Sequence, residues 1–319
     1  MTNSPILQIK DYTLALDIEG ELCNVLNNVN FDFYSGKIHA IVGESGCGKS
    51  MSVMSVLKLL PQNSVVLGGE ILFGGENILN FSEPKMRKIR GRKIALIPQD
   101  PMTSLNPLYT IENQILEVIF LHNDCTKEEA QKIAIEALEK VEFPNPKERI
   151  KAYPHELSGG MKQRVIIAMA LVANADVLIA DEPTTALDVT IQAQILKLLE
   201  NIKNQGKSIV LITHDLAVVA HYSDDISIMY MGHVVERAKT SELFKKPCHP
   251  YTNALISALP VDKNKKLKNI KGQVLPITQK IDGCPFNPRC DYATLECKSN
   301  IPALRKCVNS CVACHNPLC

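Results

Sequence analysis

A glycine-rich loop constrains the fold of this 319-residue chain more than any other feature. It reads Gly43-Glu44-Ser45-Gly46-Cys47-Gly48-Lys49-Ser50 and fits the phosphate-binding loop pattern G-x-x-x-x-G-K-[ST]. A short β-rich run at 38–42 leads into it, and a helical pattern continues to Leu60, where Pro61 ends it. Strand, loop and helix in this order form the context that a phosphate loop requires. The sequence therefore predicts a nucleotide-binding α/β core.

Two further motifs follow in a fixed order. Residues 157–164 read LSGGMKQR, and the apolar run Val177–Ala180 ends in the carboxylates Asp181 and Glu182. Two ionised carboxylates at the end of a buried run are costly unless a metal or hydrogen bonds compensate them. The ordered set of three motifs predicts an ATP-driven protein.

The residue types in these motifs suit phosphate chemistry. Backbone N–H groups of a glycine loop surround a triphosphate without clashes, and the helix that follows adds its positive N-terminal end. Lys49 is expected to reach the β- and γ-phosphates, and the Ser50 hydroxyl to ligate Mg²⁺. Asp181 is expected to hold Mg²⁺ through water, and Glu182 to act as general base. A purely structural glycine turn is the alternative, and the strand–helix context disfavours it.

Three more positions are candidates for the site. Gln99, after an apolar run that ends at Pro98, is placed to reach Mg²⁺ and the attacking water. His214 follows the expected strand Ser208–Thr213 and is a candidate for the γ-phosphate, although a lone histidine there is more often structural. The turn Ser158-Gly159-Gly160 opens a second helix. Because the first loop already holds one nucleotide, we expect this turn to contact the nucleotide that another subunit holds, which implies a dimer.

Strand and helix patterns alternate along the chain and predict a mainly parallel sheet covered on both faces. Helical patterns near 111–122 and 127–141 belong to an insert at about 100–173. After residue 245 prolines, a lysine run (263–271) and most of the cysteines mark an appended region. A solvated linker is favoured for the lysine run over contact with anionic lipid.

Charge and hydropathy exclude several classes. Lys+Arg number 35 against Asp+Glu 34, so no overall charge draws the chain to nucleic acid or acidic lipid. Residues 1–10 lack a signal-peptide pattern, and the apolar stretch 165–180 is too short to span a bilayer. We expect a cytoplasmic location, with any membrane role exercised through partners.

The motif order resembles that of an ATP-binding cassette (ABC) ATPase over roughly residues 5–245. The resemblance implies that Gly43–Ser50 is the Walker A motif, Gln99 the Q-loop and Leu157–Gln163 the LSGG motif. It likewise implies that Asp181–Glu182 is the Walker B motif, Thr185-Ala186-Leu187-Asp188 the D-loop and His214 the H-loop. Asp188 thereby joins the candidate nucleotide site. Further phrases resemble the dipeptide/oligopeptide and nickel importer ATPases, namely Gln99–Pro107, His249–Thr252 and Gly283–Cys290.

The resemblance implies an ABC-type P-loop domain with a helical subdomain and an antiparallel N-terminal β subdomain at 1–245. A cysteine-rich extension follows at 246–319. The implied function is ATP hydrolysis that powers import of di- or oligopeptides, with nickel or a metal chelate as the alternative cargo. A soluble ABC ATPase that acts on ribosomes or DNA is the reading from another class, and the single cassette disfavours it. Implied partners are two membrane permease subunits, a second ATPase subunit (a paralogue or a copy) and an extracytoplasmic binding protein, at the cytoplasmic face of the membrane.

Seven of the 11 cysteines lie at or beyond Cys284, which favours a metal site over disulfides in a reducing compartment. The resemblance implies a [4Fe–4S] cluster on Cys284, Cys290, Cys297 and Cys314, since four thiolates are its requirement. A zinc site and unliganded thiols remain as alternatives, and Cys307, Cys311 or Cys319 can substitute for a ligand.

Two positions depart from the family pattern. Leu16 stands where an aromatic residue usually stacks on adenine, and Tyr12 lies out of register. Cys47 stands where serine is usual, as a small filler or as an oxidation-sensitive thiol beside a cation.

Overall fold

The computed structural model describes residues 4–185, 187–259 and 270–318. The chain forms two compact units. Unit 1 comprises Met1–Asn80 with Leu211–Cys319, and unit 2 comprises Phe81–Val210.

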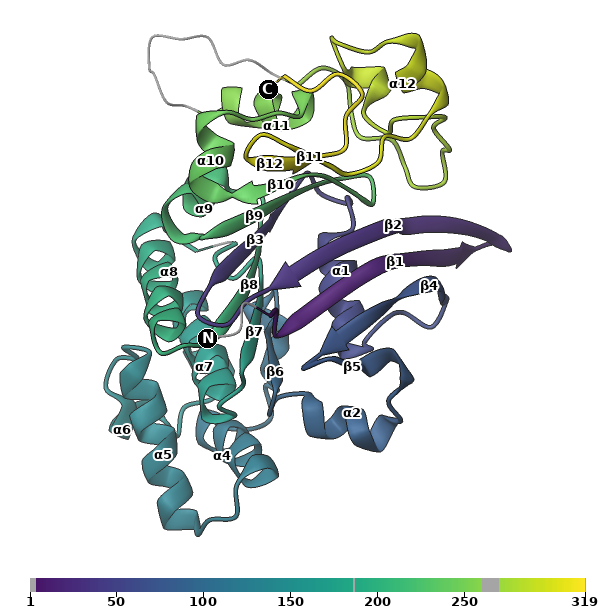
Figure 1. Cartoon of the computed structure of the whole chain (residues 1–319). Coiled ribbons are helices and arrows are strands. Elements are labelled where there is room, and N and C mark those ends of the chain that lie inside the picture. Colours follow the sequence, from purple (N-terminus) through teal and green to yellow (C-terminus); the bar gives the residue numbers. More distant parts are fainter. Residues whose placement is uncertain (1–3, 186, 260–269, 319) are drawn as a thin grey trace. The chain divides into compact units, whose positions relative to one another are not determined.

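Unit 1 begins with an antiparallel sheet in the order β2-β1-β4-β5. Its strands are β1 (Leu7–Ile18), β2 (Glu21–Phe33), β4 (Ser64–Phe73) and β5 (Glu76–Asn77), and β1 and β2 form its long paired ribbon (Figure 1). The antiparallel N-terminal β subdomain that the resemblance implies is present as this sheet. Strand β4 (SVVLGGEILF) has two apolar runs on either side of Gly68 and Gly69, so its sequence lacks the apolar and polar alternation by which a half-buried strand is recognised.

A second set of strands in unit 1 carries the glycine loop. β3 (Ile38–Val42) is entirely buried and runs parallel to β9 (Asp225–Tyr230), as continuous apolar runs in parallel sheets do. β10 (His233–Lys239) pairs antiparallel with β9, and β12 (Ser310–Val312) joins β10 to β11 (Arg305–Cys307). The cysteine-rich tail is thus ordered in part by backbone pairing. The helices of this unit are α1 (Lys49–Leu57), η1 (Ile78–Asn80), α9 (Leu216–Tyr222), α10 (Thr240–Lys245), α11 (Pro250–Ser257), η3 (Asn287–Arg289) and α12 (Leu295–Ser299).

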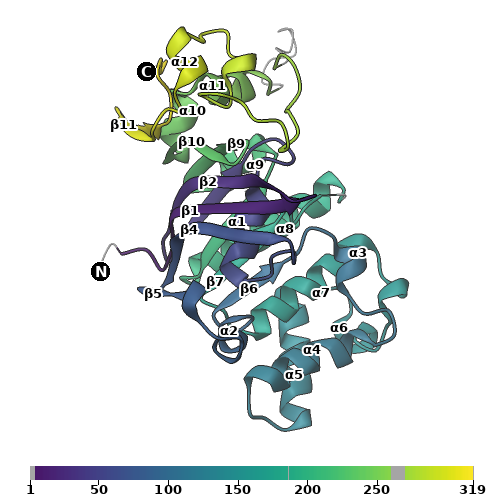
Figure 2. The same ribbon diagram turned by 90° about the vertical axis from the view of Figure 1, so that its right-hand side faces the viewer.

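Unit 2 is mainly helical (Figure 2). The two predicted helices are present as α4 (Ile111–His122) and α5 (Lys127–Lys140). Thr110 and Thr126 cap their first turns, because each threonine side chain accepts a backbone N–H of that turn. The other elements of the unit are α2 (Glu83–Ile89), β6 (Ile94–Ile97), α3 (Pro101–Ser104), α6 (Pro146–Arg149), η2 (Pro154–Glu156), α7 (Gly159–Val172), β7 (Val177–Asp181) and α8 (Val189–Asn204), and β8 (Ser208–Thr213) begins here and ends in unit 1.

The apolar stretch 165–180 divides into α7 and β7. Across the described residues, no helix has both the length and the apolar character needed to cross a membrane. Of the predicted lysine linker, residues 263–269 lie outside the described residues.

Candidate nucleotide site

The glycine loop of unit 1 has the predicted strand–loop–helix form. β3 ends at Val42, and α1 begins at Lys49. A Cβ atom at Gly43 would lie 2.3 Å from the carbonyl oxygen of Met229, so only glycine fits there. Gly48 has φ 102, a left-handed value that favours glycine. The two glycines therefore fix the path of the loop.

The Lys49 ammonium folds back over this loop. Its Nζ donates to the carbonyl oxygens of Gly43 at 2.8 Å and Glu44 at 3.1 Å. The charge is thus held at the loop, where a phosphate group would meet it.

Cys47 is buried in the same loop, with an exposed fraction of 1%. Burial raises the pKa of its thiol and outweighs the opposing effect of Lys49. A reactive cysteine needs a lowered pKa and exposure. The structure therefore favours the reading of Cys47 as a small filler.

Unit 2 brings two predicted catalytic side chains together. β6 and β7 run parallel, with Ile97 opposite Ala180, so the residues that follow both strands emerge at one edge of the sheet. The Gln99 side chain donates from Nε2 to Glu182 Oε2 at 3.0 Å. Asp181 ends β7 with 7% of its surface exposed.

One partner of Glu182 was not assigned from the sequence. Thr185 Oγ1 donates to Glu182 Oε2 at 3.0 Å. Glu182 itself has φ 46, a strained backbone value of the kind found at functional sites. A hydroxyl three residues after a carboxylate is too common in turns for the sequence alone to identify this contact.

The remaining predicted site residues are placed as follows. His214 is exposed directly after β8, in unit 1. In unit 2, Ser158 caps α7 and Asp188 caps α8, with Asp188 Oδ1 accepting the N–H of Ile191 at 2.9 Å. A Cβ at Gly160 would lie 2.8 Å from the Ile191 side chain. The glycine turn thus also serves the packing of α7 against the start of α8.

Neither candidate for adenine stacking is suited to it. Leu16 pairs across the sheet with Cys23 and carries no aromatic ring. Tyr12 has no exposed surface, so its ring is not available to stack on a ligand.

Four cysteines of the tail surround one pocket in unit 1. The lining includes Cys284, Cys290, Cys297 and Cys314. Burial, with a smaller contribution from the neighbouring thiols, raises the pKa of Cys284 and of Cys314 to about 11. Of the candidate substitute ligands, Cys311 lies in β12, opposite Arg237, and Cys319 is outside the described residues. Cys307 is disulfide-bonded, so the prediction of a substitute ligand there is wrong.

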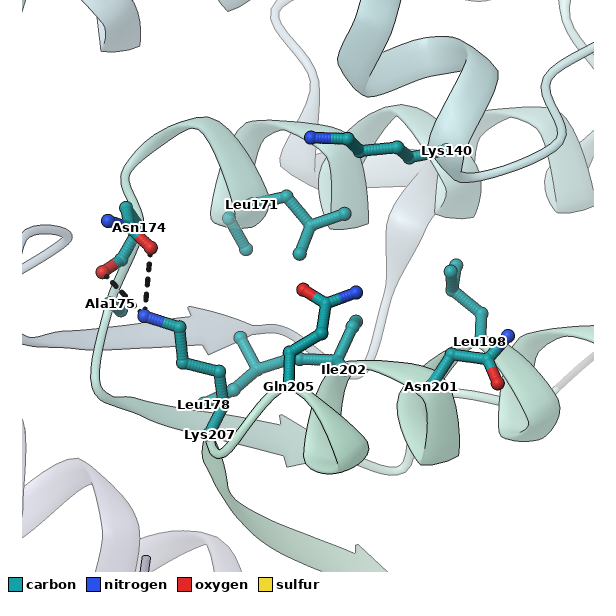
Figure 3. Close-up of a pocket in the computed structure, with 11 residues that line it drawn as sticks. Lys140, Leu171, Asn174, Ala175, Leu178, Leu198, Asn201, Ile202, Gln205 and Lys207 are labelled. Carbon is teal, nitrogen blue, oxygen red and sulfur yellow. Dashed lines mark hydrogen bonds between the residues drawn. The ribbon is translucent and has the colours of Figure 1, made fainter. Parts of the chain in front are cut away.

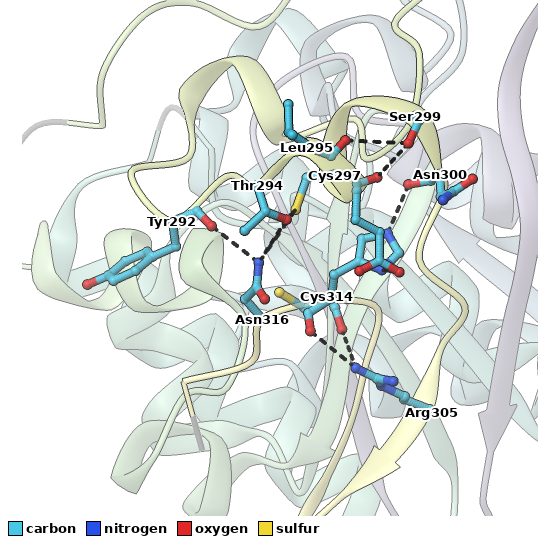
Figure 4. Close-up of polar contacts among 11 residues, drawn as sticks. Tyr292, Thr294, Leu295, Cys297, Ser299, Asn300, Arg305, Cys314 and Asn316 are labelled. Atoms are coloured by element: carbon cyan, nitrogen blue, oxygen red, sulfur yellow. Dashed lines mark hydrogen bonds and ion pairs between the residues drawn. The ribbon is translucent and has the colours of Figure 1, made fainter.

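Polar side chains hold the segments around this pocket (Figure 4). Asn316 Nδ2 lies 3.7 Å from the Cys297 sulfur, and Thr294 Oγ1 lies 3.4 Å from it. Arg305 donates to the carbonyl oxygen of Cys314 at 3.0 Å. Nevertheless, no group of three or more His, Cys, Asp or Glu among the described residues is arranged to hold a metal ion. The expected cluster is therefore not established by this arrangement.

A separate pocket of about 240 Å³ lies in unit 2 (Figure 3). Leu171, Leu178 and Ile202 give it an apolar lining. Lys207 beside it is already engaged, since its Nζ donates to Asn174 Oδ1 at 2.8 Å. None of the predicted nucleotide residues lines this pocket, so it is not the nucleotide site.

Comparisons with known proteins decide the family. Residues 26–185 match the ABC transporter family, and residues 235–297 match the C-terminal region of oligopeptide/dipeptide transporters. The chain belongs to the ABC transporter family. It is 45% identical to a probable peptide ABC transporter ATP-binding protein of Sinorhizobium fredii, over 94% of this chain and 91% of the relative.

Other relatives agree with this membership of the ABC family. The chain is 41% identical to the dipeptide transport ATP-binding protein of Escherichia coli, over 98% of this chain and 97% of that protein. Among solved structures, a dimeric ATP-binding cassette in a post-hydrolysis state, bound to ADP and Pi, has a TM-score of 0.66 at 31% identity. It covers 73% of this chain and 98% of its own. The fold is thus that of an ABC ATPase cassette.

Proposed function

We propose that this chain is the ATP-hydrolysing subunit of an importer of di- or oligopeptides. The observation that carries the proposal is the joint match to the ABC transporter family and to the C-terminal region of oligopeptide/dipeptide transporters. The relatives at 45% and 41% identity are named as peptide and dipeptide transport ATP-binding proteins, which supports the same cargo class.

Each site residue has a role in this proposal. The loop Gly43–Ser50 binds the triphosphate, with Lys49 on the β- and γ-phosphates. Glu182 takes a proton from the attacking water, and Gln99, which contacts Glu182, orients that water. His214 contacts the γ-phosphate.

The oxygen donors of Ser50, Gln99 and Asp181 fit Mg²⁺, a hard cation that prefers such ligands. When bound, Mg²⁺ neutralises charge that develops on the phosphate oxygens. The buried carboxylate of Asp181 at the end of β7 is the only charged oxygen donor of the three, and hard divalent cations prefer carboxylate oxygen.

Assembly follows from the second glycine turn. Ser158, Gly159 and Gly160 read the nucleotide of a second ATPase subunit, and the D-loop residue Asp188 joins that contact. Such a pair, a paralogue or a copy, works at the cytoplasmic face of the membrane on two permease subunits, with an extracytoplasmic binding protein delivering cargo. The dimeric cassette of similar fold supports the pairing.

The four-cysteine pocket is proposed to hold a [4Fe–4S] cluster, with zinc as the alternative. Its lining by four thiols meets the ligand count. A four-iron cluster is larger than one ion and keeps its thiolates further apart, so it does not require the close grouping that a single ion needs. A metal analysis of Cys290→Ser tests this: unchanged iron and zinc content excludes Cys290 as an essential ligand.

Uptake by cells that carry Glu182→Gln tests the transport function. Uptake of labelled dipeptides, oligopeptides and nickel, with and without a chelator, is compared with that of the control variant Glu200→Gln, since the Glu200 carboxylate on α8 is partly exposed and pairs with Lys197. We expect Glu182→Gln to lose peptide uptake but not nickel uptake, and Glu200→Gln to keep both. Selective loss of nickel uptake would assign the metal cargo, and no loss of either would contradict the importer.

A further inference from the structure

Glu44 poses an electrostatic conflict within the glycine loop. The loop is built to surround a polyanion with N–H donors, yet its second residue carries a carboxylate whose side chain is 29% exposed. A negative charge at this place would repel a bound triphosphate. The loop therefore needs a cation that neutralises Glu44 and fixes its direction.

Arg289 supplies this cation from the C-terminal region. Its two terminal nitrogens donate to both Glu44 oxygens, Nη1 to Oε2 at 2.7 Å and Nη2 to Oε1 at 3.1 Å. Such a bidentate pair fixes direction as well as charge. Only 6% of the Arg289 side chain is exposed, so water screens the pair weakly.

Arg289 is itself held from several sides. Its Nε donates to the carbonyl oxygen of Lys271 at 2.8 Å, and its Nη1 lies 3.3 Å from Tyr230 Oη. The turn η3, which ends at Arg289, is fastened because Asn287 Nδ2 donates to the carbonyl oxygen of Cys284 at 2.9 Å. The guanidinium is thus preorganised to receive Glu44.

A second contact from the same region reaches the loop. The backbone N–H of Glu44 donates to Tyr251 Oη at 3.2 Å. The Tyr251 ring lies 4.7 Å from that of Tyr230 and 5.2 Å from that of Phe286, centroid to centroid. Both the side chain and the backbone of Glu44 are therefore tied to the C-terminal region.

We propose that Arg289 is a positioning residue for nucleotide binding. Through Glu44 it holds the first half of the loop in the form that accepts a triphosphate, and it removes a repulsive charge. The C-terminal region thereby sets the ATP affinity of the cassette. The inference rests on the proposed ATP site at Gly43–Ser50.

The test measures ATP Kd by calorimetry, and KM and kcat by phosphate release, for Arg289→Gln, Glu44→Gln and the double variant. We expect Arg289→Gln to raise Kd at least about tenfold, because it leaves an uncompensated carboxylate at the phosphates. KM rises with Kd while kcat changes little, since the lost interaction serves ground state and transition state alike. A merely structural role would instead reduce the fraction of active protein at unchanged Kd.

The double variant supplies the decisive comparison. If Arg289 acts through Glu44, removal of the carboxylate restores Kd toward the wild-type value, so the two effects are not additive. Additive effects, or an unchanged Kd in Arg289→Gln, would overturn the proposal. Arg87→Gln is the matched control: the Arg87 pair with Glu83 at 3.7 Å is exposed on both sides, and the Kd of this variant should equal that of the wild type.

Arg289→Lys provides the readout if Arg289→Gln does not fold. It keeps the charge but loses the bidentate geometry, so its Kd should lie above the wild-type value, and a Kd equal to wild type would count against the proposal. ATP binding by the wild-type chain distinguishes the proposed nucleotide site from the proposed role of Arg289. If the wild-type chain binds no ATP, the nucleotide site itself is wrong, whereas intact binding with an unaffected Arg289 series removes only the positioning role.

Discussion

At the scale of single residues, neighbours in sequence and neighbours in space carry different information. The roles proposed for Lys49, Asp181 and Glu182 follow from their order in three local motifs. The partner of Glu44 does not, because Arg289 lies 245 positions further along the chain and no local pattern joins the two. A carboxylate in an anion-binding loop is nevertheless a signal that a cation must be found elsewhere.

Replacement of Glu182 by glutamine tests the proposed general base. The amide keeps the size of the side chain, but it cannot take a proton from water. We expect ATP turnover to fall about a thousandfold, which corresponds to about 4 kcal/mol of transition-state stabilisation, while ATP binding persists. Phosphate release and ATP Kd measured on the same preparation check this. A near wild-type rate would show that another group is the base.

At the scale of elements, the helices could be predicted from local sequence patterns, whereas some short strands form only through pairing with distant segments. α4 and α5 lie where the helical patterns predicted them, because each has an apolar periodicity and a threonine cap. By contrast, β12 pairs with β10, and its Ser310 lies opposite Ala238. Three-residue strands in a cysteine-rich segment have no periodicity to recognise, so their pairing could not be predicted from the sequence.

The capping box of α5 should contribute measurably to stability. Thr126 Oγ1 accepts the N–H of Glu129 at 3.3 Å, and Glu129 Oε2 accepts the N–H of Thr126 at 2.8 Å. Thr126→Ala removes the first of these bonds and should lower the free energy of unfolding of unit 2 by about 1 kcal/mol. Urea titration followed by circular dichroism measures the change. Thr126→Ser keeps the hydroxyl and should stay close to wild type, and equal stability of the alanine and serine variants would contradict the cap.

At the scale of the whole molecule, the composition shows the balance of charge but not which polar groups are buried, and the buried groups decide how stability depends on pH. His39 lies in β3 just before the glycine loop, with 3% of its surface exposed and Nε2 2.8 Å from Ser227 Oγ. Burial lowers the pKa of His39 to about 4 and outweighs the opposing effect of Asp225. The folded chain therefore keeps a neutral imidazole at a pH where the unfolded chain protonates it.

This difference predicts a loss of stability in mild acid. The unfolded histidine titrates near pH 6.5, so the contribution of His39 is fully present above that pH and is lost as the pH falls from about 6.5 toward 4. At pH 5 the loss amounts to about 2 kcal/mol. The measured quantity is the drop in the free energy of unfolding between pH 7 and pH 5. This drop should be smaller by about 2 kcal/mol in His39→Gln than in the wild type. His221→Gln, an exposed histidine on α9, should retain the wild-type difference. Equal acid sensitivity of His39→Gln and the wild type would show that His39 does not link folding to pH.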